Sequence, residues 1–317
     1  MQGGSSPGQQ PFSTVGVLGG GLIGMSWASL FAARGCRVIV VDPRPEAASQ
    51  MHDFARQAWP HLTALGLTVS DTAPDILVTP AMSALADAKF IQENGPDRLE
   101  AKLAMIGALE DVIAPGAVIA SSTSSLKASD IQAQARHPDR ILVGHPMNPP
   151  HMVPMVELVA GRQTSEATMR TAEAFYTAMN RVTIRVKKEV AGHLANRLTA
   201  ALYREAVHLV AEGIADVDSI DKAIAYGPGM RWALIGPHLT YHMGGGAGGY
   251  RHYLDHLGPT QEARWRELGE APLTEDLKAQ LVAGLAKELE GQDQATLTQR
   301  RDAALVELAQ IKAKYGF

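Results

Sequence analysis

The hydrophobic pattern of the N-terminal half alternates between short apolar runs and longer segments with helical spacing. A β-branched run at 14–18 leads into glycines, and apolar and small residues then recur at helical spacing over 22–33. Gly35 follows as a stop signal, and 37–41 is apolar after its first residue, as in a strand covered on both faces. A strand, a helix and a strand within about 30 residues form a βαβ unit, which predicts a parallel sheet.

Strands and helices continue to alternate up to about residue 187. Helical spacing over 97–109 and 165–179 separates some of the later apolar runs. The pattern predicts a Rossmann-type, doubly wound α/β domain over residues 14–188. Its further strands are expected at 90–92, 118–120, 141–143, 156–159 and 183–186.

From residue 190 onward the pattern is helical, without intervening strands. Apolar residues recur at roughly helical spacing between 190 and 209, and a charged amphipathic helix packed by one face is expected over 296–314. Turn material interrupts this pattern at 227–229 and again at 244–249. We therefore expect an all-helical second domain over residues 189–317.

Composition and charge narrow the possible partners and compartments. The 29 basic and 33 acidic side chains give a formal net charge of −4, so binding to nucleic acid through phosphate neutralisation is not expected. Cys36 is the one cysteine, which excludes an intrachain disulfide and favours a reducing compartment and a buried apolar role. No apolar run approaches the roughly 20 residues that span a bilayer. Residues 1–13 resemble a flexible leader and not a signal peptide, so we expect a cytoplasmic protein without membrane or nucleic-acid partners.

A dinucleotide-binding motif opens the first predicted helix. Gly19, Gly21 and Gly24 form a G-x-G-x-x-G pattern directly after a predicted strand. The first glycine permits a tight turn, the second lets the backbone approach a pyrophosphate, and the third allows close helix–strand packing. Leu22 and Ile23 begin the helix, whose unpaired N–H groups attract phosphates. The alternative, a glycine-rich turn without a ligand, is disfavoured by the order of strand, motif, helix and strand.

The residues after the second strand indicate which dinucleotide binds. Asp42 follows Gly24 by 18 residues, where a carboxylate accepts hydrogen bonds from the adenosine ribose and repels a 2′-phosphate. We therefore expect NAD as the cofactor. Arg44 could reach a 2′-phosphate, so NADP remains the second possibility.

Four downstream segments closely resemble the 3-hydroxyacyl-CoA dehydrogenase family in their order and spacing. They are Ser-Ser-Thr-Ser-Ser-Leu at 121–126, Gly-His-Pro-Met-Asn-Pro-Pro at 144–150, Val-Glu-Leu-Val at 156–159, and the segment 189–198. The resemblance covers residues 15–258. The stretch 227–237 is particularly like the lambda-crystallin and L-gulonate 3-dehydrogenase branch and the nearby carnitine dehydrogenases.

The resemblance implies a hydride-transfer site. His145 matches the family's general base, a role that suits an imidazole because its pKa lies near neutral pH. Glu157 matches the carboxylate that hydrogen-bonds the other ring nitrogen and stabilises the imidazolium. Ser124 and Asn196 match the residues that hold the substrate oxygen.

Further residues receive roles from the same resemblance. Asn148 is expected to order the loop beneath the site and to contact substrate, Glu93 to lie near the nicotinamide ribose, and Ser122 to contact the cofactor. Each polar residue also has a structural alternative. Ser124 could cap a helix, Asn148 could belong to an ordinary turn, and Asn196 could hydrogen-bond backbone inside a helix.

The substrate is expected to be a small free L-3-hydroxy acid, L-gulonate-like, that is oxidised to the 3-keto acid. The segment 43–88 holds two arginines, five acidic residues and no lysine, which suits the phosphates of CoA poorly. Arg231 is the candidate for binding the carboxylate, with a surface or dimer-interface role as its alternative. Trp232, Tyr241 and Tyr250 offer aromatic faces for a quaternary ammonium, so carnitine remains possible, as does a 3-hydroxyacyl-CoA.

Two pairs of histidines bear on whether the protein binds a metal. The histidine pairs at 238/242 and 252/256 have i, i+4 spacing but lack the glutamate of HExxH, so no metal is expected.

The resemblance implies a homodimer through the helical domain, which would also contribute to substrate binding. We expect an NAD-dependent 3-hydroxy acid dehydrogenase. The alternative is a non-catalytic, crystallin-like NAD-binding protein, which would not require the matched site residues.

Overall fold

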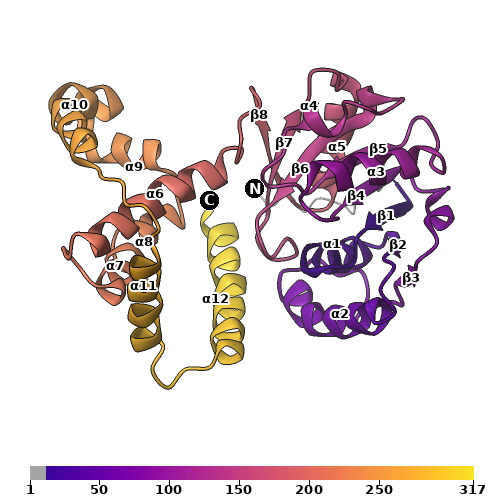
Figure 1. The fold of residues 1–317 in the computed structure, drawn as a ribbon, viewed down its shortest axis with the longest axis horizontal. Coiled ribbons are helices and arrows are strands. Elements are labelled where there is room, and N and C mark those ends of the chain that lie inside the picture. The colour runs from indigo at the N-terminus through magenta and orange to yellow at the C-terminus, as the bar shows by residue number, and fades with distance from the viewer. Residues whose placement is uncertain (1–11) are drawn as a thin grey trace. The chain divides into compact units, whose positions relative to one another are not determined.

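The computed structural model describes residues 12–317 and divides between Arg197 and Leu198 into two compact units (Figure 1). The first unit is α/β and the second is all-helical, as the hydrophobic pattern predicts. The division lies later than the expected boundary at 188/189, because the segment after the last strand and the start of helix α6 (Ala195–Ala211) belong to the first unit. The leader expected over residues 1–13 falls almost wholly outside the described residues.

One eight-stranded sheet forms the centre of the first unit, in the order β3-β2-β1-β4-β5-β6-β7-β8. Neighbouring strands are parallel except β6 and β7, which are antiparallel. The chain direction across the sheet reverses between β1 and β4, the switch point at which doubly wound sheets bind ligands. The strands are β1 (Thr14–Leu18), β2 (Arg37–Val41), β3 (Leu77–Thr79), β4 (Phe90–Glu93), β5 (Val118–Ser121), β6 (Ile141–Pro146), β7 (Met155–Ala160) and β8 (Val182–Val186).

Helices cover both faces of this sheet, which explains why its strands are apolar on both sides. Val38 and Val40 pack in the core beneath α1, α2 and α5, whereas Ile39 and Val41 pack in the core beneath α3 and α4. The layers leave the carboxyl ends of the central strands accessible. The elements are α1 (Leu22–Ala33), α2 (Ala47–Ala64), η1 (Met82–Leu85), α3 (Leu99–Glu110), α4 (Ala128–Ile131), η2 (Pro138–Arg140) and α5 (Glu166–Ala178).

The second unit contains helices only, around a small core formed by Val207, Val210 and Leu277. The expected turn at 227–229 is in fact the start of a short helix, because Pro228 takes its first position. Among residues 12–317, no helix combines the length and the hydrophobicity that crossing a bilayer requires. The helices after α6 are α7 (Val217–Ala225), α8 (Pro228–Trp232), α9 (Pro237–Gly244), η3 (Gly246–Gly248), α10 (Gly249–Glu267), α11 (Glu275–Glu288) and α12 (Gln294–Tyr315).

Candidate active site

The glycine motif forms a tight turn between β1 and α1. Gly19 has a φ of +93°, and a Cβ on Gly24 would lie 1.9 Å from the carbonyl oxygen of Gly19, so both positions require glycine. A Cβ on Gly21, in contrast, would meet no described atom within 4 Å. The space beside the start of α1 is therefore open, and it fits the pyrophosphate of a dinucleotide, which the N–H groups of Leu22 and Ile23 would hold.

Asp42 directly follows β2 and lies against the glycine turn. Its Oδ2 accepts a hydrogen bond from the N–H of Gly20 at 2.7 Å, and the guanidinium of Arg44 donates to both carboxylate oxygens. Burial raises the pKa of Asp42, but the hydrogen bonds from Arg44 and Gly20 outweigh burial and lower it overall. Asp42 is thus an anion at neutral pH, at the position where a dinucleotide's ribose binds in this fold.

His145 and Glu157 form a buried pair on adjacent strands. Because β6 and β7 are antiparallel, the register places His145 directly opposite Glu157. Nδ1 of His145 lies 2.8 Å from Oε2 of Glu157, and the two residues are 5% and 0% exposed. A carboxylate can only accept, so Nδ1 carries the proton and Nε2 keeps the lone pair that a general base needs.

The second oxygen of Glu157 connects the pair to the start of α6. Oε1 accepts hydrogen bonds from the N–H groups of Leu194 at 2.7 Å and Ala195 at 3.0 Å. Burial raises the pKa of Glu157, but the hydrogen bonds from His145, Ala195 and Leu194 outweigh burial and lower it overall. Glu157 therefore stays ionised beside the imidazole, and it also fixes the turn of helix that holds Asn196.

A cavity of about 360 Å³ opens beside this pair at the carboxyl ends of β4, β5 and β6. Six of the predicted site residues line it: Ile23, Ser122, Ser124, His145, Asn148 and Asn196. The structure thus brings the predicted base, the predicted oxygen-binding residues and one end of the glycine motif to one place. Seven lining residues were not predicted: Asn94, Gly95, Asp97, Lys102, Thr123, Pro146 and Met147.

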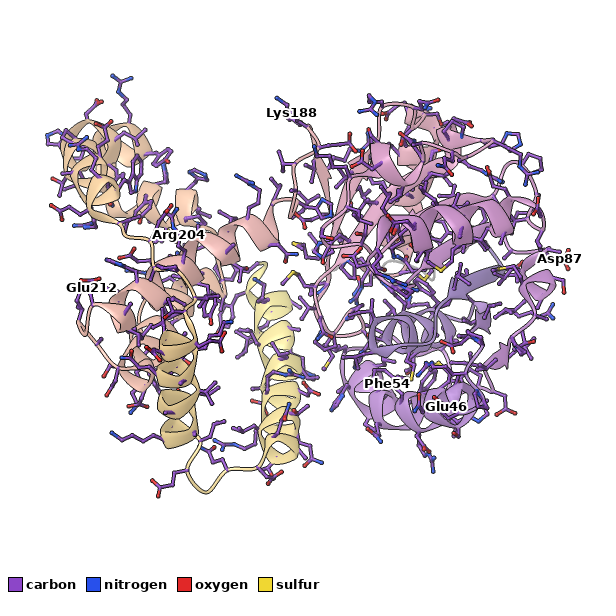
Figure 2. All side chains as sticks on the ribbon, in the orientation of Figure 1. Glu46, Phe54, Asp87, Lys188, Arg204 and Glu212 are labelled. Atoms are coloured by element: carbon purple, nitrogen blue, oxygen red, sulfur yellow. The ribbon has the colours of Figure 1, made fainter. Side chains whose placement is uncertain are left out.

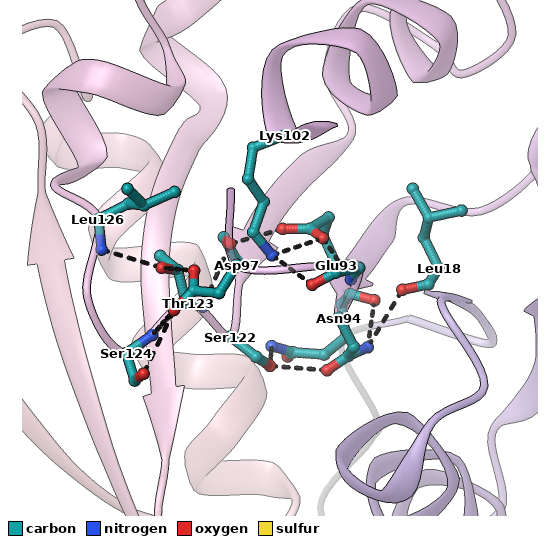
Figure 3. Close-up of polar contacts among 12 residues, drawn as sticks. Leu18, Glu93, Asn94, Asp97, Lys102, Ser122, Thr123, Ser124 and Leu126 are labelled. Carbon is teal, nitrogen blue, oxygen red and sulfur yellow. Dashed lines mark hydrogen bonds and ion pairs between the residues drawn. The ribbon is translucent and has the colours of Figure 1, made fainter. Parts of the chain in front are cut away.

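Asp97 organises the serine-rich loop that follows β5 (Figure 3). Its carboxylate accepts hydrogen bonds from the hydroxyls of Thr123, Ser124 and Ser125 and from the N–H of Ser124. Burial raises the pKa of Asp97, but these bonds and the charge of Lys102 lower it overall. Ser124 does not cap a helix, since α4 has Lys127 at its N-cap position. The loop is instead held by an anion on the cavity wall.

Glu93, the last residue of β4, has both oxygens engaged inside the protein. Oε1 accepts from Nζ of Lys102 at 2.9 Å and from the N–H of Gly95 at 2.6 Å, and Oε2 accepts from the hydroxyl of Ser121 at 2.6 Å. Lys102 is only 1% exposed, and its ion pair with Glu93 offsets the cost of burying its ammonium group. Glu93 therefore positions Lys102, which lines the cavity, and a direct contact of Glu93 with the cofactor stays a prediction.

Ser122 also acts within a network of side chains. Its hydroxyl donates to Oδ1 of Asn94 at 2.7 Å, and it accepts from Nε2 of Gln92 at 2.9 Å and from Nε1 of Trp27 at 3.3 Å. Nδ2 of Asn94 donates in turn to the carbonyl oxygens of Leu18 and Gln92, so this network fixes a residue that lines the cavity (Figure 3). A direct cofactor contact of Ser122 remains a prediction.

His193 is a second buried imidazole that the sequence did not single out. Its ring centroid lies 5.1 Å from that of His145, and its Nε2 donates to the carbonyl oxygen of Thr123 at 3.0 Å. Burial lowers the pKa of His193, and His145 lowers it further. His193 therefore stays neutral while His145 exchanges a proton, and it ties the serine loop to the segment before α6.

The remaining predicted substrate residues belong to the second unit. Arg231 and Trp232 lie on α8, a short helix where a turn was expected, and Trp232 is 40% exposed. Tyr241 and Tyr250 both stack on Tyr253, at centroid distances of 4.5 and 6.3 Å. These two tyrosines are therefore already partners in an aromatic row, and the substrate roles of Arg231 and Trp232 stay predictions.

Comparison with known families covers most of the chain. Residues 14–190 match the NAD binding domain of 3-hydroxyacyl-CoA dehydrogenase, and residues 192–282 match its C-terminal domain. The chain belongs to the 3-hydroxyacyl-CoA dehydrogenase family. This confirms the resemblance, the order of the two domains and NAD as the cofactor.

Several curated relatives in this family carry the name L-carnitine dehydrogenase. The relative from Streptomyces coelicolor is 41% identical over 303 residues, covering 95% of each chain. Those from Bacillus cereus and Burkholderia mallei are both 38% identical, over 97% and 96% of this chain and 95% and 96% of theirs. The chain is therefore an NAD-dependent dehydrogenase of the 3-hydroxyacyl type.

Solved structures of similar proteins share the fold. A 5-formyl-3-hydroxy-2-methylpyridine 4-carboxylic acid 5-dehydrogenase, described as an NAD+ dependent dismutase, superposes with a TM-score of 0.77 at 26% identity, covering 95% of this chain and 99% of that one. The (S)-3-hydroxybutyryl-CoA dehydrogenase of Ralstonia eutropha gives 0.63 at 26% identity, over 73% and 82% of the two chains. Free acids and CoA thioesters thus both occur in the names of proteins with this architecture.

Proposed function

We propose that this chain oxidises the 3-hydroxyl of L-carnitine to a ketone with NAD. The supporting observation is its 35–41% identity to L-carnitine dehydrogenases over nearly its whole length. Of the free acids considered from the sequence, this favours carnitine over an L-gulonate-like acid.

The proposed reaction uses the buried pair as a proton acceptor. Nε2 of His145 takes the proton of the substrate hydroxyl, and ionised Glu157 stabilises the imidazolium that forms. Ser124 and Asn196, which line the same cavity, hold the substrate oxygen. NAD, when bound, accepts the hydride from the carbinol carbon. Because Glu157 and His145 are both buried, their interaction is little screened by water.

The charges of the first unit favour a cationic substrate over a CoA thioester. Asp97 is an anion on the cavity wall, which attracts a quaternary ammonium and repels phosphate, whereas Lys102, the cation in the same lining, is paired with Glu93. The segment 43–88 adds five acidic side chains against two arginines, without a lysine. Both features oppose the binding of the CoA phosphates.

A substrate panel tests this proposal. The purified protein is incubated with NAD and L-carnitine, D-carnitine, L-gulonate, L-3-hydroxybutyrate or 3-hydroxybutyryl-CoA, and NADH absorbance is followed. We expect kcat/KM for L-carnitine to exceed that for each other compound by about 100-fold, since buried polar groups discriminate strongly against substrates that leave them unpaired. Faster turnover of L-gulonate or of the CoA thioester contradicts the proposal. A flat trace on all five compounds favours the non-catalytic alternative.

We further propose that Arg231 holds the substrate carboxylate and that the second unit pairs with a second copy of the chain. Arg231 is exposed on α8, and several large apolar side chains of this unit are also exposed, including Leu198, Tyr203 and Tyr226 at 68%, 58% and 79%. Tyr203 and Tyr226 line one hollow of this unit, and large exposed apolar side chains that lie together are a feature of protein–protein interfaces. A homodimer through the second unit would cover these side chains.

Replacing Arg231 by Met separates its two proposed roles. The loss of a bidentate carboxylate contact should raise KM for L-carnitine by about 30-fold and leave kcat within about threefold. Light scattering should give twice the chain mass of 33.8 kDa for both proteins. An unchanged KM together with a halved mass would assign Arg231 to the dimer interface instead.

We also propose a cytoplasmic location. Cys36 is buried, and burial raises its pKa to about 11, so it is a neutral thiol at physiological pH and not a nucleophile. A chain with this one thiol fits a reducing compartment.

A further inference from the structure

Arg44 lies at the adenosine end of the predicted cofactor site, between β2 and α2. It lies two residues after Asp42 and two residues before Glu46, the N-cap residue of α2, which is labelled in Figure 2. Its side chain is 41% exposed, whereas that of Asp42 is only 7% exposed. A cationic side chain at this place is well suited to a 2′-phosphate, which is the group that distinguishes NADP from NAD.

The guanidinium of Arg44 is nevertheless occupied by partners from the protein itself. Nε donates to Oδ1 of Asp42 at 2.9 Å, and Nη2 donates to Oδ2 of Asp42 at 3.1 Å and to the carbonyl oxygen of Gly20 at 3.0 Å. Nη1 donates to Oε1 of Gln50 at 3.2 Å. A guanidinium has five N–H groups, so these bonds leave little capacity for a phosphate.

Both oxygens of the Asp42 carboxylate also have hydrogen-bond partners from the protein itself. Oδ1 accepts from the N–H of Arg44 at 2.9 Å as well as from its Nε, and Oδ2 accepts from the N–H of Gly20 at 2.7 Å as well as from Nη2. The hydrogen bond to Asp42 raises the pKa of Arg44, so both partners stay charged. Ribose hydroxyls that approach Asp42 therefore compete with the guanidinium, while the two backbone N–H groups can remain in place.

We propose that Arg44 is a latent 2′-phosphate ligand and that Asp42 keeps it occupied. In this arrangement Asp42 excludes NADP twice, because its charge repels the phosphate and its oxygens hold the arginine that would otherwise bind it. Loss of the charge at position 42 releases a planar, bidentate donor beside the glycine turn. The position of Arg44 thus makes the preference for NAD depend chiefly on Asp42, with Glu46, whose Oε1 lies 3.8 Å from Nη1 of Arg44, as a second anion nearby.

Calorimetric binding of NADH and NADPH tests the proposal without any hydroxy acid substrate, so its outcome is independent of the substrate assignment. The two ligands differ only in the 2′-phosphate. The proteins compared are the wild type, D42N, R44M and the double variant D42N/R44M. Asparagine removes the charge but keeps an oxygen that can accept from the N–H of Gly20.

The wild type and R44M should bind NADH about 100-fold more tightly than NADPH, because Asp42 repels the phosphate in both proteins. D42N should bind NADPH about 30-fold more tightly than the wild type does, through charge-assisted bonds from the released arginine. D42N/R44M should bind NADPH at least about tenfold more weakly than D42N does. This non-additivity assigns the gain to Arg44.

Two results would overturn the proposal. Equal NADPH affinity of D42N and D42N/R44M would show that Arg44 does not bind the phosphate. Similar affinities of the wild type for NADH and NADPH would show that Asp42 does not exclude the phosphate. Thermal melting checks that each variant is folded. If D42N does not fold, D42S and D42S/R44M are measured by the same criteria, since the serine hydroxyl also accepts a hydrogen bond.

Discussion

Replacing His145 by Gln is expected to lower kcat about 1000-fold, within the range that a general base contributes. The amide of glutamine cannot take up the hydroxyl proton, whereas Nε2 of His145 is left basic by the bond between Nδ1 and Glu157. NADH affinity should remain within about threefold of the wild type, because a residue needed only in the transition state changes kcat more than binding. Steady-state rates with NAD and L-carnitine give kcat, and calorimetry gives the affinity for NADH.

His137 provides a matched control for this variant. It is an exposed histidine at the start of η2, and it is not among the residues that line the cavity of about 360 Å³. H137Q should keep kcat within about twofold, as is usual for surface substitutions. A kcat for H145Q above about one tenth of the wild-type value would contradict a general-base role.

Replacing Glu157 by Gln is expected to lower kcat about 100-fold and also to destabilise the first unit. Glutamine is neutral and cannot stabilise the imidazolium. Its NH2 group takes the place of one oxygen and cannot accept. Either the bond that Oε2 receives from His145 or the two that Oε1 receives from Leu194 and Ala195 are then lost. A buried donor left without an acceptor costs about 1–3 kcal/mol of the free energy of unfolding.

The stability difference between the wild type and E157Q should depend on pH with a definite sign. The pKa of Glu157 is lowered in the folded protein, so its contribution is complete above its unfolded pKa of about 4.3. This contribution is lost as the pH falls through the lowered, folded-state pKa. Urea unfolding should therefore show the largest difference near neutral pH and a shrinking difference on acidification. Exposed Glu100, in the first turn of α3, offers the control E100Q, and a pH-independent difference for E157Q would contradict the assignment.

The elements that depend on interactions between residues close in the sequence were predicted well. Helix α1 has the expected bounds, and the strand β1 before it ends where the glycines begin. The sterics of Gly19 and Gly24 act within a few residues, so a motif is sufficient to recognise them. Strand β3 was not predicted because three partly exposed residues form no clear pattern.

The pairing of His145 with Glu157 was expected from the family resemblance and not from the spacing of the residues. Their contact arises from the antiparallel register of β6 and β7, which the apolar pattern does not reveal. Asp97, Lys102 and His193 were not predicted at all. The run of hydroxyl-bearing residues at 121–125 indicates that hydrogen-bond acceptors are needed, but does not say which acid supplies them.

The family resemblance indicated the chemistry of one imidazole and one carboxylate. The sequence by itself determined the glycine turn and the alternation of strands and helices. The turn and the alternation follow from backbone sterics and hydrophobic periodicity, which involve residues close together in the sequence. Only the tertiary structure decided that Asp97 holds the serine loop and that Glu93 binds Lys102. It also decided that Asp42 accepts hydrogen bonds from both Arg44 and Gly20. Hydrogen bonds and ion pairs act over a few ångströms, and the fold decides which side chains, near or far along the chain, come within that range.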